Sequence, residues 1–231
     1  FKVIIDWVAN HTGWDHEWTQ SFPGFYKKNA VGEFYDANGW LDVIDLNYYD
    51  HAMRREMIRS MEFWIRWCDI DGFRCDMAHL VPLDFWRDAR KYLDGIKPLF
   101  WLAETEEVNY QHAFDCSYAW SFMHLTENIL KDKCSTVDLL LLLKQYQTKN
   151  LPQTNHLFFT TNHDENSWNG TEYEKYGPAA GCLAVLTCTW DGLPLIYSGQ
   201  EMPNYKRLKF FDKDTIQWTG QYDLHHFYKT L

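Results

Sequence analysis

Short apolar runs alternate with longer segments of helical periodicity along this chain of 231 residues. The runs have the composition of buried strands, and in the longer segments apolar residues recur every three or four positions, as on one face of a helix. This alternation predicts βα units around a parallel sheet. Six strands are expected, at residues 2–6, 72–76, 99–104, 114–123, 156–162 and 193–198.

Four segments are expected to form helices between these strands. Asp50 is placed to cap the first, whose apolar positions are Met53, Met57, Met61, Trp64, Ile65 and Cys68. Pro82 can begin the second, and its expected buried stripe is Trp86, Ala89, Leu93 and Ile96. The third is leucine-rich and spans residues 137–146, and the fourth is alanine-rich and starts near Pro178.

Residues 13–49 form a segment that is too long for an ordinary βα loop. The segment is rich in Trp, Phe, Tyr, Asp and Asn, and it is expected to be a small inserted subdomain. A closed barrel of parallel strands has eight strands in roughly 250 residues, and only six are expected here. We hypothesise that two N-terminal βα units, and anything beyond Leu231, lie outside this sequence.

The charge of the chain limits its partners. Its 32 acidic and 22 basic residues give a net charge of -10, which repels phosphate backbones and anionic lipid surfaces. We therefore expect no nucleic-acid or membrane partner, whereas a neutral polymer would not be repelled. The 12 Trp, 14 Tyr and 15 Phe supply flat apolar faces on which a sugar ring can lie, although most of them are expected in the core.

The six cysteines contain no CxxC pair, so neither a zinc cluster nor a thioredoxin-like motif is indicated. Mostly free thiols are expected. No stretch is long and apolar enough to span a bilayer, and the sequence does not indicate a compartment.

Three of the apolar runs lead into a carboxylic acid. These acids are Asp76, Glu104 and Asp164. Cleavage of a glycosidic bond passes through a positively charged state, so one acid must protonate the leaving oxygen while another carboxylate attacks or stabilises the anomeric carbon. Acids at the ends of separate strands can divide this work between them.

The environments of Asp76 and Glu104 predict different protonation states. Side chains alternate along a strand, so Arg74 and Asp76 are expected on one face, where the guanidinium lowers the pKa of Asp76 as a nucleophile requires. Glu104 follows two apolar residues and is expected to share a cavity with two anionic aspartates. It should therefore hold its proton to higher pH and serve as the acid.

Six short motifs accompany these residues. They are DWVANH at 6–11, DLNY at 45–48, GFRCDMAHL at 72–80, LAET at 102–105, TNHDE at 161–165 and GLPLIYSGQE at 192–201. In their residues and in their order along the chain, they resemble motifs of the α-amylase family of retaining glycoside hydrolases, glycoside hydrolase family 13. The resemblance covers nearly the whole chain.

The resemblance implies a TIM-type (β/α)8 barrel, of which this chain is an incomplete piece from about strand 3 to strand 8. Residues 1–12 correspond to strand 3, residues 13–49 to the small inserted subdomain after it, and residues 50–231 to strands 4 to 8 with their helices.

The resemblance also implies a role for each candidate residue. Asp76 would be the nucleophile, Glu104 the general acid and then base, and Asp164 the residue that binds sugar hydroxyls and stabilises the transition state. The implied substrate-binding residues are His11, Arg74, His163 and His79.

Two features of the family pattern bear on substrate and metal binding. Many members have Lys and then His where this chain has His79 and Leu80, and that Lys usually binds sugar beyond the cleaved bond. The chemistry needs no cofactor. Asn10 is a candidate ligand of the family's structural calcium, although its amide is equally suited to holding loop backbone groups.

Other interpretations remain open. An isolated Asp76 and Arg74 would be a structural salt bridge, and His163 with Asp164 could be metal ligands in a barrel metallohydrolase. The favoured function is hydrolysis of α-glucosidic, mainly α-1,4, bonds in starch-like glucans or maltooligosaccharides. The alternatives are an α-glucan transglycosylase and a non-catalytic glucan-binding homologue or inactive fragment.

Overall fold

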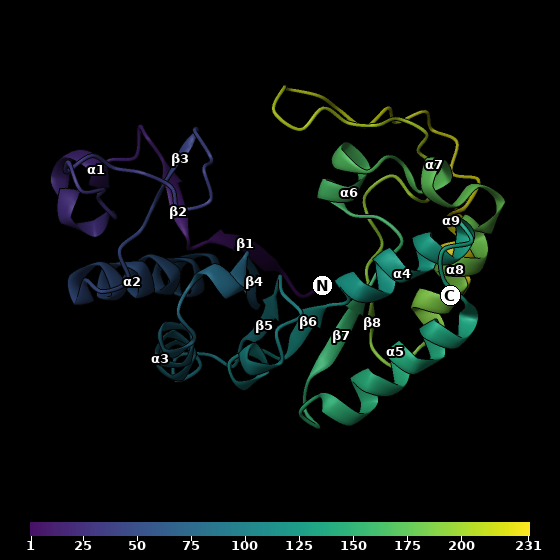
Figure 1. The fold of residues 1–231 in the computed structure, drawn as a ribbon, viewed down its shortest axis with the longest axis horizontal. Helices are drawn as coiled ribbons and strands as arrows, with labels where there is room; N and C mark the ends of the chain where they lie inside the picture. The colour runs from purple at the N-terminus through teal and green to yellow at the C-terminus, as the bar shows by residue number, and fades with distance from the viewer. The chain divides into compact units, whose positions relative to one another are not determined.

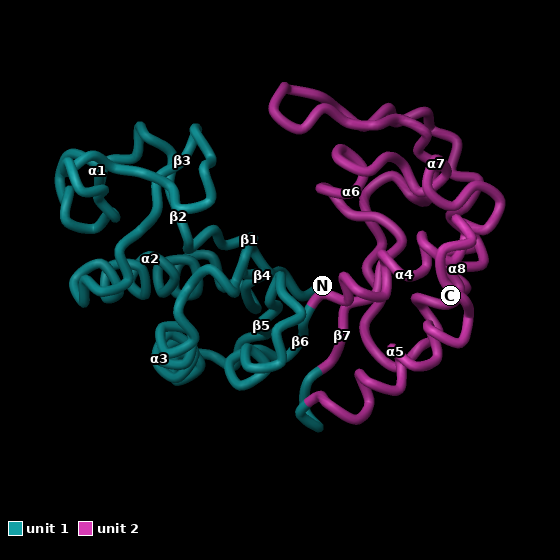
Figure 2. Tube along the Cα trace, in the orientation of Figure 1, with its two compact units in different colours: residues 1–117, 151–154 teal, residues 118–150, 155–231 magenta.

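The computed structural model describes residues 1–231 and consists of two compact units (Figures 1 and 2). The first unit contains residues 1–117 and 151–154, and the second contains residues 118–150 and 155–231. The chain therefore leaves the first unit, returns to it for four residues, and then completes the second.

A parallel sheet forms the centre of the first unit. Its strands, in spatial order, are β1 (Ile4–Val8), β4 (Gly72–Asp76), β5 (Phe100–Ala103) and β6 (Cys116–Tyr118). The last residue of β6, Tyr118, belongs to the second unit. Asp6 pairs with Arg74 across β1 and β4, and Cys75 pairs with Ala103 across β4 and β5. A Cβ atom at Gly72 would lie 2.0 Å from the Phe100 carbonyl oxygen, so this close approach requires glycine.

Two amphipathic helices contribute to the core of this unit (Figure 1). Helix α2 (His51–Cys68) is capped as predicted, because Asp50 Oδ1 accepts hydrogen bonds from Ala52 N at 2.7 Å and Met53 N at 3.1 Å. Helix α3 (Leu83–Leu93) follows Pro82. Their buried side chains are Met53, Met57, Met61, Ile65, Phe85, Trp86, Ala89 and Leu93. The buried residues of α2 recur every four positions from Met53 to Ile65, and Trp64 and Cys68 of the predicted stripe, which fall outside this row, are exposed.

The predicted subdomain contains a small antiparallel pair and two short helical turns. Strand β2 (His11–Gly13) pairs with β3 (Val43–Asp45), and between them lie α1 (Trp18–Ser21) and η1 (Pro23–Phe25). The Tyr48 hydroxyl, near the end of this segment, donates a 2.6 Å hydrogen bond to the Ala9 carbonyl. Further 3-10 turns in the first unit are η2 (Ala78–Leu80) and η3 (Val108–His112).

The second unit is mainly helical around two parallel strands, β7 (Asn155–Phe158) and β8 (Leu193–Pro194). Phe122, Leu143 and Phe158 belong to its core. Its helices are α4 (Trp120–Leu130), α5 (Thr136–Lys149), α6 (His163–Trp168), α7 (Glu172–Tyr176), η4 (Gly177–Ala179), α8 (Ala180–Thr189) and α9 (His225–Thr230).

The first predicted strand is shifted by two residues, to Ile4–Val8, and the last four are shorter than expected, two of them markedly. The aromatic run at 114–123 gives only three strand residues, because Trp120 begins helix α4. The run at 193–198 gives two strand residues. All six cysteines are free, as expected, and no helix has the length and apolarity required to cross a membrane.

Candidate active site

One buried guanidinium holds three carboxylates at the end of β4. Arg74 Nη1 donates to Asp6 Oδ1 at 2.9 Å and to Asp76 Oδ1 at 2.7 Å. Its Nη2 lies 2.9 Å from Glu104 Oε2. Asp76 and Glu104, the predicted nucleophile and acid, are therefore both within reach of a single side chain.

The parallel register explains why these groups meet. Arg74 and Asp76 point to the same face of β4 because they are two residues apart, while Phe73 and Cys75 are buried on the other face. Asp6 is the register partner of Arg74 on β1. Glu104 follows β5, and its N–H donates to the Cys75 carbonyl at 3.0 Å. Asp6 was assigned no role from the sequence, although its position on the neighbouring strand makes it a third partner of Arg74.

The residue after Asp76 has an unusual backbone conformation. Met77 has φ 41°, in the left-handed region, which costs a non-glycine residue about 1–2 kcal/mol. In this conformation its N–H donates a 2.9 Å hydrogen bond to Glu104 Oε2. The turn after the candidate nucleophile thus fixes the carboxylate of the candidate acid.

The contacts of Glu104 bear on its protonation. The guanidinium of Arg74 and the N–H of Met77 both face Oε2, and both stabilise a negatively charged carboxylate. The protonated Glu104 expected from its apolar flank stays a prediction.

The two candidate histidines of the first unit flank this centre in sequence. His79 lies in η2, three residues after Asp76, and its Nδ1 atom is buried without a hydrogen-bond partner. His11 begins β2, and its ring lies 5.5 Å from that of Trp40 in an edge-on arrangement. Their contacts with substrate stay predictions.

The proposed calcium ligand Asn10 lies beside a carboxylate that is already paired, and its role in calcium binding stays a prediction. Asn10 is buried, and its Nδ2 atom donates to Asp45 Oδ1 at 3.3 Å. The other oxygen of Asp45 pairs with Lys27 Nζ at 2.8 Å and accepts from Ala37 N at 3.2 Å. A cation would have to displace the lysine ammonium from the nearest carboxylate. No group of three or more His, Cys, Asp or Glu side chains in residues 1–231 is arranged to hold a metal ion.

Asp164 and His163 begin helix α6 of the second unit. Asn162 caps this helix, since its Oδ1 accepts from Asp164 N at 3.0 Å and Glu165 N at 2.8 Å. His163 Nε2 lies 3.3 Å from Asp164 Oδ2. Burial, and to a smaller extent the Asp164 carboxylate, raise the pKa of Tyr197. Participation of Asp164 in the same site as Asp76 stays a prediction.

A buried ion pair anchors α6. Lys175 Nζ lies 2.9 Å from Glu165 Oε2, and both residues are buried. Asn169 Nδ2 also donates to Glu165 Oε2, at 3.0 Å. Sequence periodicity gave no signal for this pair, because the two residues lie on separate short helices.

We expect Lys175→Met to lower the free energy of unfolding by about 3 kcal/mol, because it leaves the Glu165 carboxylate buried without its cation. Denaturant titration of the whole protein measures this change. Lys209→Met, which removes an exposed partner of Asp212, is the control and should have little effect. Combining Lys175→Met with Glu165→Leu should recover most of the loss. Equal stability of the wild type and Lys175→Met would contradict the anchoring role.

Comparison with protein families identifies the chain. The model of the alpha amylase catalytic domain matches residues 20–227. The chain belongs to the alpha-amylase family. The prediction made from the six motifs is thus confirmed at the level of the family.

Individual relatives support this assignment. Over 94% of this chain, the sequence is 26% identical to Alpha-amylase MalA of Haloarcula japonica, of which it covers 33%. It is also 26% identical to Alpha-amylase 3 of Dictyoglomus thermophilum, covering 87% of this chain and 47% of that protein. The chain therefore spans between a third and a half of the length of these family members.

Solved structures of the family have the same fold. A noncanonic maltogenic alpha-amylase, AmyB, from Thermotoga neapolitana matches 95% of this chain and 51% of its own, with a TM-score of 0.87 and 29% identity. An alpha-amylase from Lactobacillus plantarum matches 93% of this chain and 54% of its own, with a TM-score of 0.84 and 28% identity. The fold is a partial (β/α)8 barrel, as predicted.

Proposed function

We propose that the protein is a retaining glycosidase that cleaves α-glucosidic, mainly α-1,4, bonds in starch-like glucans or maltooligosaccharides. The observation that carries this proposal is the Arg74 guanidinium, which contacts Asp76 and Glu104 from the ends of adjacent parallel strands. Retaining enzymes require two carboxyl groups about 5–5.5 Å apart, and two acids that share one guanidinium are compatible with such a spacing.

The reaction would proceed in two steps. Asp76 attacks the anomeric carbon while protonated Glu104 gives its proton to the leaving oxygen, so that the glycosidic bond breaks and a glycosyl ester forms. In the second step Glu104 removes a proton from water, which attacks the anomeric carbon and releases Asp76. Inversion at each step leaves the product with the α configuration of the substrate.

The remaining residues would bind and orient the sugar. Arg74 fixes the Asp76 carboxylate through the 2.7 Å hydrogen bond. Asp164 would bind sugar hydroxyls and stabilise the transition state. His11, His163 and His79 would contact the substrate. No residue of this scheme needs a metal ion or cofactor for its proton or electron transfers.

Family membership supports α-glucans as the substrate class. The relatives are named as alpha-amylases, cyclomaltodextrinases, a maltogenic alpha-amylase and a trehalose-6-phosphate hydrolase. Most of these names refer to α-glucans, but the relatives differ in the bond or chain that their names imply. Bond preference and chain-length preference therefore need direct measurement.

Product analysis tests this function. We expect the whole protein to release short maltooligosaccharides from starch, and proton NMR spectra should show the α-anomer first. Parallel digests of pullulan and maltotriose measure which bonds and which chain lengths the protein prefers. An initial β-anomer would refute the retaining mechanism. Products longer than a maltotriose substrate would identify a transglycosylase, and binding without products would identify a non-catalytic homologue. Loss of activity with a chelator, together with an active Glu104→Gln variant, would identify a metal-dependent hydrolase.

A further inference from the structure

Three aromatic rings form an exposed cluster in the second unit. We call Trp168, Phe210 and Phe211 the aromatic platform. The Trp168 ring centroid lies 4.8 Å from that of Phe210 and 5.8 Å from that of Phe211, and the two Phe rings are 4.9 Å apart. The three residues remain 60%, 46% and 75% exposed. The rings thus pack against one another and remain partly exposed to solvent.

The platform lies on the helix that carries Asp164. Trp168 ends α6, and Asp164 is four residues earlier on it. Side chains four apart on a helix are neighbours, with Cβ atoms about 5–6 Å apart. The indole is therefore one helical turn from the candidate transition-state residue, a spacing comparable with one sugar ring.

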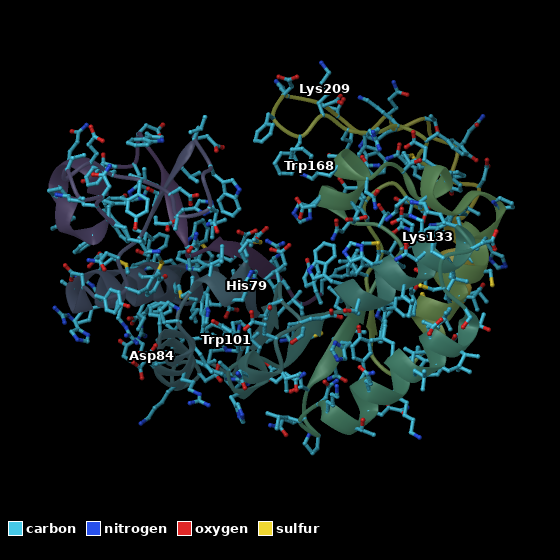
Figure 3. The ribbon with its side chains drawn as sticks, viewed as in Figure 1. His79, Asp84, Trp101, Lys133, Trp168 and Lys209 are labelled. Atoms are coloured by element: carbon cyan, nitrogen blue, oxygen red, sulfur yellow. The ribbon has the colours of Figure 1, made fainter.

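Hydrogen bonds hold the two Phe residues next to α6. Buried Asn166 donates from Nδ2 to the Lys206 carbonyl at 3.1 Å, and its Oδ1 accepts from Leu208 N at 2.8 Å. Lys206 in turn pairs with Asp214, whose carboxylate also accepts from Lys209 N at 3.1 Å. Figure 3 shows Trp168 next to the loop that carries Lys209. These hydrogen bonds hold the platform in place in the absence of a ligand, so less conformational entropy of the loop is lost on binding.

We propose that the aromatic platform binds a sugar unit of an α-glucan chain, next to the unit that Asp164 contacts. The inference rests on the proposed function, because it takes the sugar at Asp164 as its starting point. The platform would favour longer substrates, since only a chain that extends past Asp164 along α6 reaches the rings.

The chemistry of the platform fits a neutral sugar. One face of a pyranose presents C–H groups, which pack favourably on the electron-rich face of an aromatic ring. Lys209 and Asp212 lie beside the rings in the sequence and offer hydrogen-bonding groups to sugar hydroxyls. A protein partner is a weaker fit, because a standard protein interface uses about 20–30 residues on each side, whereas this cluster contains three.

Chain-length dependence tests the proposal in the whole protein. For the wild type, kcat/KM should rise from maltotriose to maltoheptaose. We expect Trp168→Ala, and separately Phe211→Ala, to lower kcat/KM for maltoheptaose about tenfold while changing that for a p-nitrophenyl α-glucoside little. Trp218→Ala is the matched control, because Trp218 is 56% exposed in the same loop but lies outside the platform. It should behave as wild type.

A binding measurement separates this proposal from the proposed function. Calorimetric titration with maltoheptaose should show weaker binding by Trp168→Ala and Phe211→Ala than by wild type and Trp218→Ala, even if the protein cleaves no glucan. If the wild type cleaves glucans and both platform variants keep its chain-length dependence and its affinity for maltoheptaose, the platform proposal is wrong and the proposed function stands. If the wild type cleaves no glucan but binds maltoheptaose more tightly than both platform variants, the proposed hydrolase function is wrong and the platform proposal stands.

Discussion

Replacing Asp76 by asparagine is expected to lower kcat for maltooligosaccharides by about 10⁴-fold or more, the scale seen when a catalytic nucleophile is removed. An amide cannot form the glycosyl ester on which the retaining pathway depends. Its oxygen can still accept the hydrogen bond from Arg74, and Arg74 keeps Asp6 and Glu104 as partners. The loss should therefore appear in turnover, with little change in the unfolding midpoint.

Two further measurements identify the cause of that loss. Azide added to Asp76→Gly, which removes the whole side chain, should restore some turnover and give a β-glycosyl azide, because the small anion can attack the anomeric carbon from the vacated side. Asp6→Asn is the matched control, since it also removes a carboxylate partner of Arg74 but leaves the nucleophile in place. We expect its kcat to remain within about tenfold of wild type. Equal losses in Asp76→Asn and Asp6→Asn would mean that Asp76 acts only through Arg74.

Glu104→Gln should lower kcat for maltooligosaccharides by about 10²–10⁴-fold, the contribution expected of a positioned general acid. The loss should shrink for the first step with α-glucosyl fluoride, because fluoride leaves without a proton. Glutamine can still accept from Met77 N through its amide oxygen, so the turn after β4 should persist. Comparing the two substrates under single-turnover conditions isolates the bond-breaking step.

The pH profile adds a second criterion for Glu104. In the wild type, kcat should fall on the alkaline side as the acid loses its proton, and this limb should vanish in Glu104→Gln. Persistence of the limb, or an equal loss with the fluoride and the maltooligosaccharide, would assign proton donation to another group.

The centre of the first unit could be predicted from the sequence because strand alternation and parallel register determine it. Two-residue spacing placed Arg74 and Asp76 on one face, and the ion pair between them confirms that placement. Glu104 follows an apolar strand, and its backbone bond to Cys75 puts it beside β4. The contribution of Asp6 was missed because it depends on the register between two strands, which no periodicity within one strand reveals.

The second unit was less predictable. Helices α6 and α7 have only six and five residues, which is too short for an apolar stripe to appear, and they depend on caps and on the Glu165–Lys175 pair. The aromatic run before α4 contained both a strand and a helix start, and aromatic residues suit either. The positive φ of Met77 was also beyond prediction, since nothing in a methionine signals it.

The three-way contact of Arg74 has a consequence for the charge balance of the proposed reaction cycle. Once Asp76 is esterified to a sugar it carries no charge, and a guanidinium paired with it alone would be left uncompensated in a buried position. Asp6 Oδ1 remains 2.9 Å from Nη1, and the Asp6 side chain is 52% exposed. The Asp6 carboxylate, which forms no bond to the sugar, would keep the charge of Arg74 balanced and its side chain in place until water hydrolyses the covalent intermediate.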